Sequence, residues 1–420
     1  MLQCVSTKTL SADIMSQLGP ILKLLAALQF AATATSEPPN APPQNAVTYQ
    51  FQNRDAWKLE NDRLRVSILH GAGHIAEIVL KTPSGESVNP LWVPPWPSLD
   101  PWTFDVNKHG SRYGTGVESP LLTGIMGHNL CFDFWGPPSA AESQAGVAFH
   151  GEVSILKAEK VLQAESSLTH RLHLERSGTS IMRTMKLVPG QSVLYVEETA
   201  ENHMGVDKPF GWVQHVTFGP PFVNHETVYF DASATQGDLG GVEYESLGTW
   251  PVGAAGEGQR DYRRFSPEAP SSKMAYFLVD PKRDLGFIAA LNTEHKLLIG
   301  YLFWRAEYPW MMVWEENRQL QTPPWNGETR TRGMEFGNTR IPGSAKEYFK
   351  KPEMYGTPTF GWLEANGKLT RRYLVFLTEI PQGITGVRDV RLEGSEIVVV
   401  AEGTMETPRI AYDPSLFPRL

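Results

Sequence analysis

Hydrophobic and polar positions alternate along most of the chain after residue 46, and short turn sequences interrupt the alternation. In RLRVSILHGAGHIAEIVL, Leu64, Val66 and Ile68 share one side of an expected strand, the chain turns at HGAG, and an apolar strand returns. The stretch THRLHLERSGTSIMRTMKLVPGQSVLYVEETAEN repeats this pattern, with turns at RSGTS and VPGQS. The alternation predicts a succession of antiparallel hairpins.

Long amphipathic helical patterns are absent from this part of the sequence, and SAAESQAG at 139–146 supports one short turn at most. Short strands with a turn about every eight to twelve residues predict an all-β protein, built as a large antiparallel β-sandwich. Because no internal repeat or change of composition divides the chain, we predict one domain over 49–382. Residues 383–420 are expected to form a C-terminal hairpin that packs on the same domain.

The N-terminal segment has the pattern of an export signal. An apolar run at 21–32 is too short to span a bilayer and is followed by small residues, which predicts a signal peptide over 1–36 and a proline-rich linker over 37–48. Lys23 interrupts the run, so a disordered or amphipathic leader on a cytoplasmic protein remains the alternative. We expect an exported protein with no membrane span in the mature chain.

Composition narrows the range of partners. The 420 residues carry a net charge of -8 without a lysine or arginine run, which argues against a nucleic-acid partner. The two cysteines are Cys4 and Cys131, and signal-peptide cleavage would remove Cys4, so no disulfide framework is expected. Abundant aromatic residues, with 12 Trp and 19 Phe, suit either a β-sandwich core or stacking on sugar rings.

Three segments place a titratable residue in an apolar or glycine-rich strand context: FHGEVS with His150, FGWVQHVTFGPPF with His215, and RTRGMEFGNTRIPG with Glu335. Burial in such a context shifts a pKa and can prepare a group for acid-base chemistry. Each residue also has a structural interpretation. Either histidine can be a hydrogen-bonded core residue, and Glu335 can form an ion pair with Arg332 or Arg340.

A resemblance to the galactose mutarotase (aldose 1-epimerase) superfamily spans residues 57 to 380. LENDRLRVSILHGAGHIAEIVLK resembles the first hairpin of that family, and FHGEV resembles its leucine-histidine-glycine segment. WVQHVTFG resembles its second histidine strand, and GMEFGNTRIP resembles the strand that bears its catalytic glutamate. The order and spacing of the motifs agree with the family, which implies a galactose mutarotase-like supersandwich with a sugar groove.

The resemblance also implies a chemistry and a set of roles. Interconversion of two anomers removes the proton from the C1 hydroxyl and protonates the ring oxygen, so that the ring opens, rotates and recloses. The family pattern would make Glu335 the base, His215 the acid, and His150 a group that binds the substrate near the ring oxygen or shares the acid role. No cofactor is required.

The sequence departs from the family upstream of the first histidine, where PLLTGIMGHNLCFDFWGPP lacks the arginine of the mutarotases. Candidate replacements for that arginine are Arg112 and Arg340. His128, Asn129 and Asp133 are further candidates for substrate contacts, although GHNLCFDFWG is also compatible with a capped turn around a buried tryptophan. These differences predict a divergent, mutarotase-like branch with its own substrate contacts.

An aromatic and acidic segment follows in YLFWRAEYPWMMVWEENRQLQTPPWNGETRTRG. Alternation places Trp310, Met312 and Trp314 on one face of an expected strand. If that face lines the groove, Trp314 can stack on a sugar ring and Glu316 can bind its hydroxyl groups. If it does not, the same residues are ordinary sandwich core.

Three functions remain open at this point. The first is an aldose 1-epimerase acting on a small-molecule carbohydrate, which requires Glu335 and a histidine to face each other across a pocket. The second is a non-catalytic carbohydrate-binding protein on the same fold. The third is a glycoside hydrolase or lyase that uses two carboxylates such as Asp133 and Glu335. No metal site is expected, because His170 and His173 lie three residues apart on an expected strand and therefore point to opposite faces.

Overall fold

The structure is a computed structural model that describes residues 49–239, 246–255 and 258–418. The predicted signal peptide (1–36) and linker (37–48) lie outside the described residues. The described residues belong to one compact unit, and none of their helices is long and apolar enough to cross a membrane. The boundaries at 382 and 383 stay predictions.

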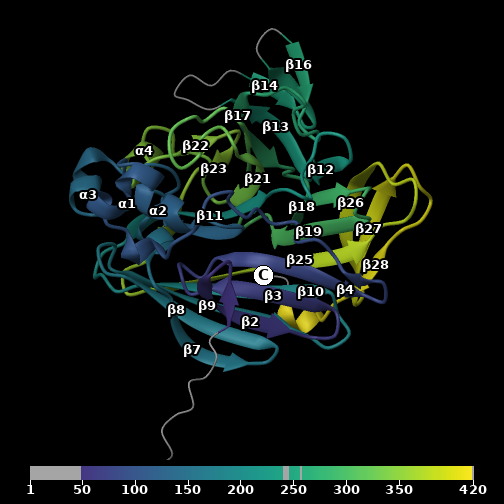
Figure 1. The fold of residues 1–420 in the computed structure, drawn as a ribbon, viewed down its shortest axis with the longest axis horizontal. Helices are drawn as coiled ribbons and strands as arrows, with labels where there is room; N and C mark the ends of the chain where they lie inside the picture. Colours follow the sequence, from purple (N-terminus) through teal and green to yellow (C-terminus); the bar gives the residue numbers. More distant parts are fainter. Residues whose placement is uncertain (1–48, 240–245, 256–257, 419–420) are drawn as a thin grey trace, which may run out of the picture. The chain divides into compact units, whose positions relative to one another are not determined.

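Two large antiparallel sheets form the sandwich that the alternating pattern predicts (Figure 1). Within the described residues the larger sheet contains, in spatial order, β1 (Gln50–Phe51), β2 (Arg54–Glu60), β3 (Leu64–Leu69), β4 (Ile75–Thr82), β6 (His128–Asp133), β11 (Lys208–Phe218), β21 (Arg330–Gly337), β20 (Trp310–Asn317), β17 (Ser271–Val279), β13 (Ala234–Asp238), β14 (Ser246–Thr249), β15 (Val252–Ala255) and β16 (Gly258–Asp261), with β5 (Gly85–Glu86) beside β4 and β24 (Gly361–Leu363) beside β11.

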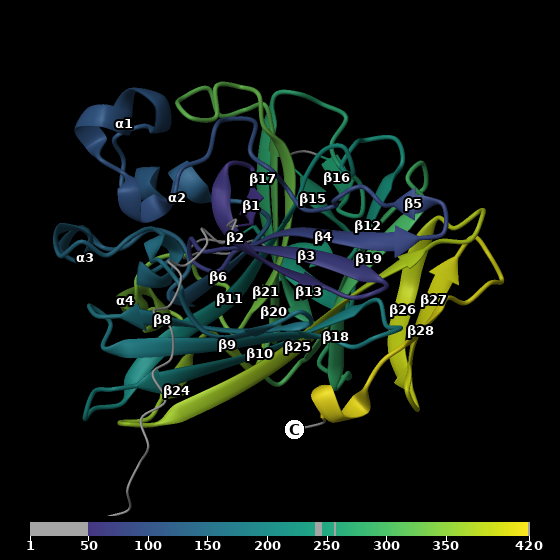
Figure 2. The same ribbon diagram turned by 60° about the horizontal axis from the view of Figure 1, so that its bottom comes forward.

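The smaller sheet contains, in spatial order within the described residues, β12 (Val228–Ala232), β18 (Leu285–Asn292), β19 (Leu297–Trp304), β25 (Lys368–Glu379), β10 (Val193–Asn202), β9 (Thr179–Leu187), β8 (Ser167–Leu174) and β7 (Glu159–Ala164). The hairpins expected from the two alternating stretches are present as β3–β4 and β8–β9–β10. Figure 2 shows the strands of this sheet running beneath β3 and β4.

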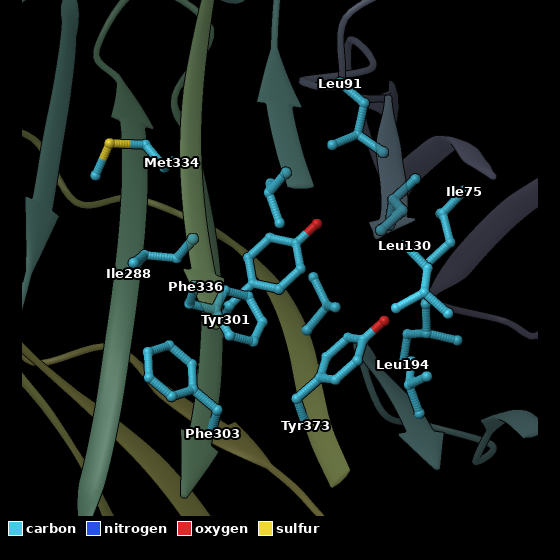
Figure 3. Packing of buried hydrophobic residues seen from close by; sticks show 14 of the residues in the cluster. Ile75, Leu91, Leu130, Leu194, Ile288, Tyr301, Phe303, Met334, Phe336 and Tyr373 are labelled. Carbon is cyan, nitrogen blue, oxygen red and sulfur yellow. The ribbon is translucent and has the colours of Figure 1, made fainter. Parts of the chain in front are cut away.

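The inner faces of the two sheets meet in one apolar core (Figure 3). Leu130 and Phe336 come from the larger sheet, while Leu194, Phe303 and Tyr373 come from the smaller one. The rings of Phe303 and Phe336 stack with centroids 4.3 Å apart. Because successive strand residues alternate between faces, burying this set leaves the intervening residues of the larger sheet on its other face.

A polar network crosses this apolar core. Arg183 on β9 and Glu198 on β10 are directly opposite each other, fully buried, and form an ion pair of 2.7 Å. Glu198 also accepts hydrogen bonds from Trp212 Nε1 (2.9 Å) and Gln214 Nε2 (2.6 Å) on β11. Gln214 Oε1 in turn lies 2.9 Å from His128 Nε2 on β6. The network therefore joins β9, β10, β11 and β6.

The C-terminal segment forms a small sheet of β26 (Gly386–Glu393), β27 (Glu396–Glu402) and β28 (Arg409–Ala411). Its apolar residues, including Val390 and Val399, share a buried cluster with Leu298 and Phe376 of the smaller sheet. Figure 2 shows this small sheet in yellow at the side of the molecule opposite α1 and α3. The segment therefore packs on the same unit through the outer face of the smaller sheet.

The helices of the described residues are short. They are α1 (Val106–Tyr113), α2 (Ser119–Gly124), α3 (Ala140–Gln144) and α4 (Ala345–Tyr348), with 3-10 turns η2 (Pro101–Thr103), η3 (Glu152–Ile155) and η4 (Pro414–Leu416); β22 (Glu353–Met354) pairs with β23 (Thr357–Pro358). The expected turn near residue 139 is α3, which begins with a capping box formed by Ser139 and Glu142. Helices α1 and α2 were not expected from the sequence pattern.

The buried network generates a stability prediction. Arg183→Met leaves the Glu198 carboxylate buried without its cation, so we expect the free energy of unfolding to fall by about 3–5 kcal/mol in urea titrations. The matched control is Arg372→Met, which removes a partly exposed ion pair with Glu197 and is expected to cost less than about 1 kcal/mol. Equal losses in the two variants would contradict the role given to the network.

Candidate active site

The candidate site lies on the face of the larger sheet that points away from the sandwich core. On β11, Trp212 and Gln214 face the core, so Val213, His215 and Thr217 occupy the opposite face. Strand β6 places Asn129 opposite His215. In the pairing of β11 with β21, Gln214 is opposite Phe336 and Thr217 is opposite Gly333. His215 and Glu335 lie between these two pairs and are therefore next to each other.

His215 and Glu335 are in direct contact. His215 Nε2 lies 3.3 Å from Glu335 Oε1, and both side chains are almost completely buried. The other ring nitrogen of His215, Nδ1, lies 3.0 Å from the hydroxyl of Thr217. The sequence interpretation expected the two groups to face each other across a pocket, but strand pairing places them side by side.

Glycine makes room for the carboxylate. Gly333 lies two residues before Glu335 and therefore on the same face of β21. A Cβ atom at Gly333 would lie 3.0 Å from Glu335 Oε1 and 3.3 Å from Cβ of Trp314. The missing side chain at Gly333 of GMEFG thus leaves space on this face of the sheet for the Glu335 carboxylate.

His150 completes the group from outside the sheet. It was expected in a strand, but it lies in the turn before η3 in a left-handed conformation (φ 66°). The backbone N–H of Gly136 donates to His150 Nδ1 at 2.9 Å, so in the neutral ring the proton lies on Nε2. The His150 and His215 ring centroids are 5.0 Å apart. The structure therefore brings all three predicted catalytic residues together.

Burial controls the protonation of this group. It lowers the pKa of His215 to about 4, although its own backbone opposes the shift. It also lowers the pKa of His150 well below its ordinary value, with the nearby His215 charge acting in the same direction. Burial raises the pKa of Glu335 well above its usual range, opposed by the indole of Trp135. Burial therefore favours the uncharged form of each group, a protonated Glu335 beside a neutral His215, in which the two groups hold one proton between them.

These groups open into a cavity of about 470 Å³, a size suited to a small molecule. The lining residues are Glu118, Leu121, Leu122, Ile125, Trp135, Gly136, Pro137, Phe149, His150, His215, Met274, Trp314, Leu320, Thr322, Trp325, Glu335 and Pro342. Aromatic and aliphatic side chains dominate this lining, and the ionisable members are Glu118, His150, His215 and Glu335.

Two tryptophans form one wall. Trp314 lines the cavity from β20, as one of the two interpretations of the PWMMVWEE segment predicts, and its ring meets Trp325 edge-on at 5.9 Å. Trp325 stacks against Trp92 at 6.1 Å. Trp310 shares the face of Trp314 but is buried in a neighbouring cluster. This face of β20 therefore lines the cavity at Trp314 and is packed in the protein interior at Trp310.

Other predicted substrate contacts lie away from the cavity. His128 points into the sandwich core, where its ring meets the rings of Tyr301 and Tyr373 at 5.5 Å. Its neighbour Asn129 lies on the site face beside His215 and is buried, but it is not among the lining residues. Asp133 forms an ion pair of 2.7 Å with Lys208 at the edge of a different, smaller cavity.

The charged candidates are also separated from the lining. Arg112 lies exposed on α1. Arg340 is buried in an ion pair with Asp238 and packs over the ring of Tyr276. Glu316 is buried and accepts hydrogen bonds from the backbone N–H groups of Gln319 and Leu320, so it holds the loop that carries Leu320 and Trp325 into the cavity.

One part of the lining packs against Trp325 and was not predicted by the sequence pattern. It consists of α2 and the residue that follows it, with Leu121, Leu122 and Ile125 in the lining. The signal for α2 is a proline at its start, in SPLLTG, which is compatible with a first helical turn. Trp135 and Phe149 flank the histidine turn and gave no separable sequence signal.

Among the described residues, no group of three or more potential metal ligands is close enough to hold an ion. His170 is buried against Trp57, whereas His173 is half exposed near Glu159. The two histidines therefore lie in different surroundings on β8.

No family model matches the sequence, and no curated protein matches it. Solved structures match in fold. An aldose 1-epimerase candidate from Klebsiella pneumoniae is 12% identical, with 80% of this chain and 82% of that chain covered and a TM-score of 0.57. A galactose mutarotase-like protein from Clostridium acetobutylicum is 11% identical, with 79% and 98% covered and a TM-score of 0.52.

A galactose mutarotase related enzyme from Lactobacillus acidophilus is 11% identical, with 78% of this chain and 98% of that chain covered and a TM-score of 0.51. Identities this low establish the fold rather than the activity. The chain therefore has the galactose mutarotase-like β-sandwich fold in a divergent sequence, which confirms the predicted resemblance at the level of fold.

The protonated state of Glu335 generates a second prediction. The folded chain binds the Glu335 proton more tightly than the unfolded chain does. The contribution of this proton to folding stability is therefore complete below pH 4.5 and is lost as pH rises. We expect wild-type stability, relative to that of Glu335→Gln, to fall as pH rises above 4.5, by at most about 1.4 kcal/mol per pH unit, in urea titrations at a series of pH values. The control Glu396→Gln, at an exposed position, should follow the wild type. Parallel curves for wild type and Glu335→Gln would contradict the assignment.

Proposed function

We propose that the protein is an aldose 1-epimerase-like isomerase that interconverts the anomers of a small carbohydrate by acid-base ring opening. The observation that carries this proposal is the direct contact between His215 and Glu335 in the cavity. The two oxygens that exchange protons during anomerisation are both bonded to C1 and therefore lie side by side. An acid and a base 3.3 Å apart can reach both of them at once.

The proposed reaction begins with the neutral pair. His215 Nε2 takes the proton of the C1 hydroxyl while the Glu335 carboxyl gives its proton to the ring oxygen, and the bond between C1 and the ring oxygen breaks. The open aldehyde rotates about C1–C2. Closure on the opposite face returns one proton from His215 to the carbonyl oxygen and one from the new hydroxyl to Glu335.

The charge-separated pair formed on ring opening is an imidazolium in contact with a carboxylate, so each charge stabilises the other inside the apolar cavity. The resulting roles are opposite to those implied by the family resemblance, which made Glu335 the base and His215 the acid. The pair holds one proton, which lies on Glu335 in the resting state and on His215 after ring opening. Burial favours the resting arrangement because both groups are then uncharged.

His150 and Thr217 support the pair in this proposal. The Nε2–H of His150 is a donor beside His215, suited to hold a substrate oxygen near the reacting centre. Thr217 contacts the remaining nitrogen of His215 and fixes the ring orientation. Gly136 holds His150 in the same way, through its backbone N–H.

A non-catalytic carbohydrate-binding protein is the second candidate, and the wall of Trp314 and Trp325 favours it, since indoles stack on sugar rings. Such a protein has no need for a contact acid-base pair. Hydrolysis by Asp133 and Glu335 has less support, because Asp133 is paired with Lys208 and does not line the cavity.

The catalytic proposal predicts loss of mutarotation on mutation. With a freshly dissolved α-anomer followed by polarimetry, we expect Glu335→Gln and His215→Asn each to lower kcat/KM by about 10²–10⁴-fold. The matched controls Glu396→Gln and His173→Asn, at exposed positions, should retain the wild-type rate. Sugar binding without mutarotation in the wild type would instead support the binding protein.

The pKa of His215 predicts the acid side of the pH profile. Because His215 must be neutral to accept the first proton, kcat/KM should fall only as pH approaches about 4. The measurement is the enzymatic mutarotation rate from pH 3.5 to 8, after subtraction of the uncatalysed rate at each pH. A decline centred on the ordinary histidine pKa of 6.5 would show that burial does not set the resting state.

A further inference from the structure

We propose that the substrate of this cavity is an uncharged pyranose whose ring hydroxyls are largely removed or masked by apolar groups, as in deoxy, O-alkyl or O-acyl sugars. This inference rests on the proposed function, because it names the substrate class of the same site. It follows from the distribution of polar and apolar groups around the acid-base pair.

Among the described lining residues, the polar side chains besides His215 and Glu335 include Thr322 and the partly exposed Glu118. Next to the acid-base pair are the Nε2–H of His150 and the indole N–H of Trp135, which acts on the Glu335 carboxyl. The last two are donors. These groups can bind the anomeric hydroxyl and the ring oxygen, and they leave few hydrogen-bond partners for the other hydroxyl groups of a sugar.

The rest of the described lining is mostly apolar. Leu121, Leu122 and Ile125 form an aliphatic wall that packs against Trp325, and Trp314 lies beside Trp325. A pyranose can stack one face on an indole, but the hydroxyls of a free hexose project from the ring edge in all directions. Hydroxyls buried against leucine and isoleucine lose their hydrogen bonds to water without replacement, which disfavours a fully hydroxylated sugar.

The aliphatic wall is held firmly in place. Trp96 Nε1 donates to the carbonyl of Leu122 at 2.9 Å, and Arg54 Nη1 donates to the carbonyl of Gly124 at 2.7 Å. Arg54 is buried and paired with Asp100 at 2.9 Å. Because two backbone carbonyls of this segment accept hydrogen bonds from buried donors, the position of its apolar side chains in the cavity is fixed by the fold.

Charge excludes another class of sugar. Among the described residues, the lining contains no lysine or arginine, and its ionisable members include the partly exposed Glu118. The buried Arg340 is paired with Asp238 and lies outside the lining. A sugar phosphate or sugar acid would therefore lose its hydration without gaining a cation, and Glu118 would repel it.

The test compares three probes with the full-length protein: tetra-O-methyl-D-glucose, which is free only at its anomeric hydroxyl, D-glucose, and D-glucose 6-phosphate. Mutarotation is followed by polarimetry, and binding by quenching of tryptophan fluorescence. Since each buried methyl group strengthens binding by about fourfold, we expect kcat/KM for the methylated sugar to exceed that for D-glucose by at least about tenfold. D-Glucose 6-phosphate should be the poorest substrate.

Matched variants link the preference to the cavity. Met274 lines the cavity and is 37% exposed, so Met274→Gln changes polarity at nearly constant volume with little risk to folding. We expect it to lower the preference for the methylated sugar by about threefold or more. Met405→Gln, at a position 98% exposed and outside the lining, should leave the preference unchanged.

The outcomes separate this inference from the proposed function. Faster turnover of D-glucose or of its phosphate would overturn the inference while supporting the isomerase. Saturable binding of tetra-O-methyl-D-glucose without mutarotation of any probe would support the inference and overturn the isomerase. Absence of binding of the methylated sugar would overturn the inference.

Discussion

The buried network around Glu198 is the constraint on which the rest of the structure depends. Glu198 holds Arg183 within the smaller sheet and also accepts hydrogen bonds from Trp212 and Gln214 on the larger one. A slip of β11 by one residue would leave this carboxylate and its arginine without their partners and would turn His215 into the core. The polar network on the inner face therefore sets the register that places His215 beside Glu335 on the outer face.

The site combines chemistry from the sheet with shape from the connections. The sheet supplies His215 and Glu335 in fixed mutual geometry, as strand pairing does for cross-strand neighbours. The turn carrying His150, the helix α2 and the loop held by Glu316 supply much of the rest of the cavity lining. In the proposed function, this division separates the acid-base pair, which the sheet fixes, from the other substrate contacts, which the connections supply.

Much of the fold could be predicted from the sequence, because the alternation of apolar and polar residues is a local pattern. The hairpins around residues 64–82 and 167–202 form as predicted. The strand assigned to His150 was wrong, since a left-handed turn before η3 leaves no periodic signal. The short helices α1 and α2 were missed for a related reason: six to eight residues are too few to show a helical period clearly.

The sequence by itself determined the sandwich and identified the segments that carry His150, His215 and Glu335, because strand alternation and glycine context are encoded locally. Only the tertiary structure decided which candidates share a cavity. It turned His128 into the core and joined Asp133 to Lys208, and it placed the acid and base in contact rather than across a pocket. The physical reason is that such contacts depend on strand order and register between residues at least 75 positions apart, which no local pattern specifies.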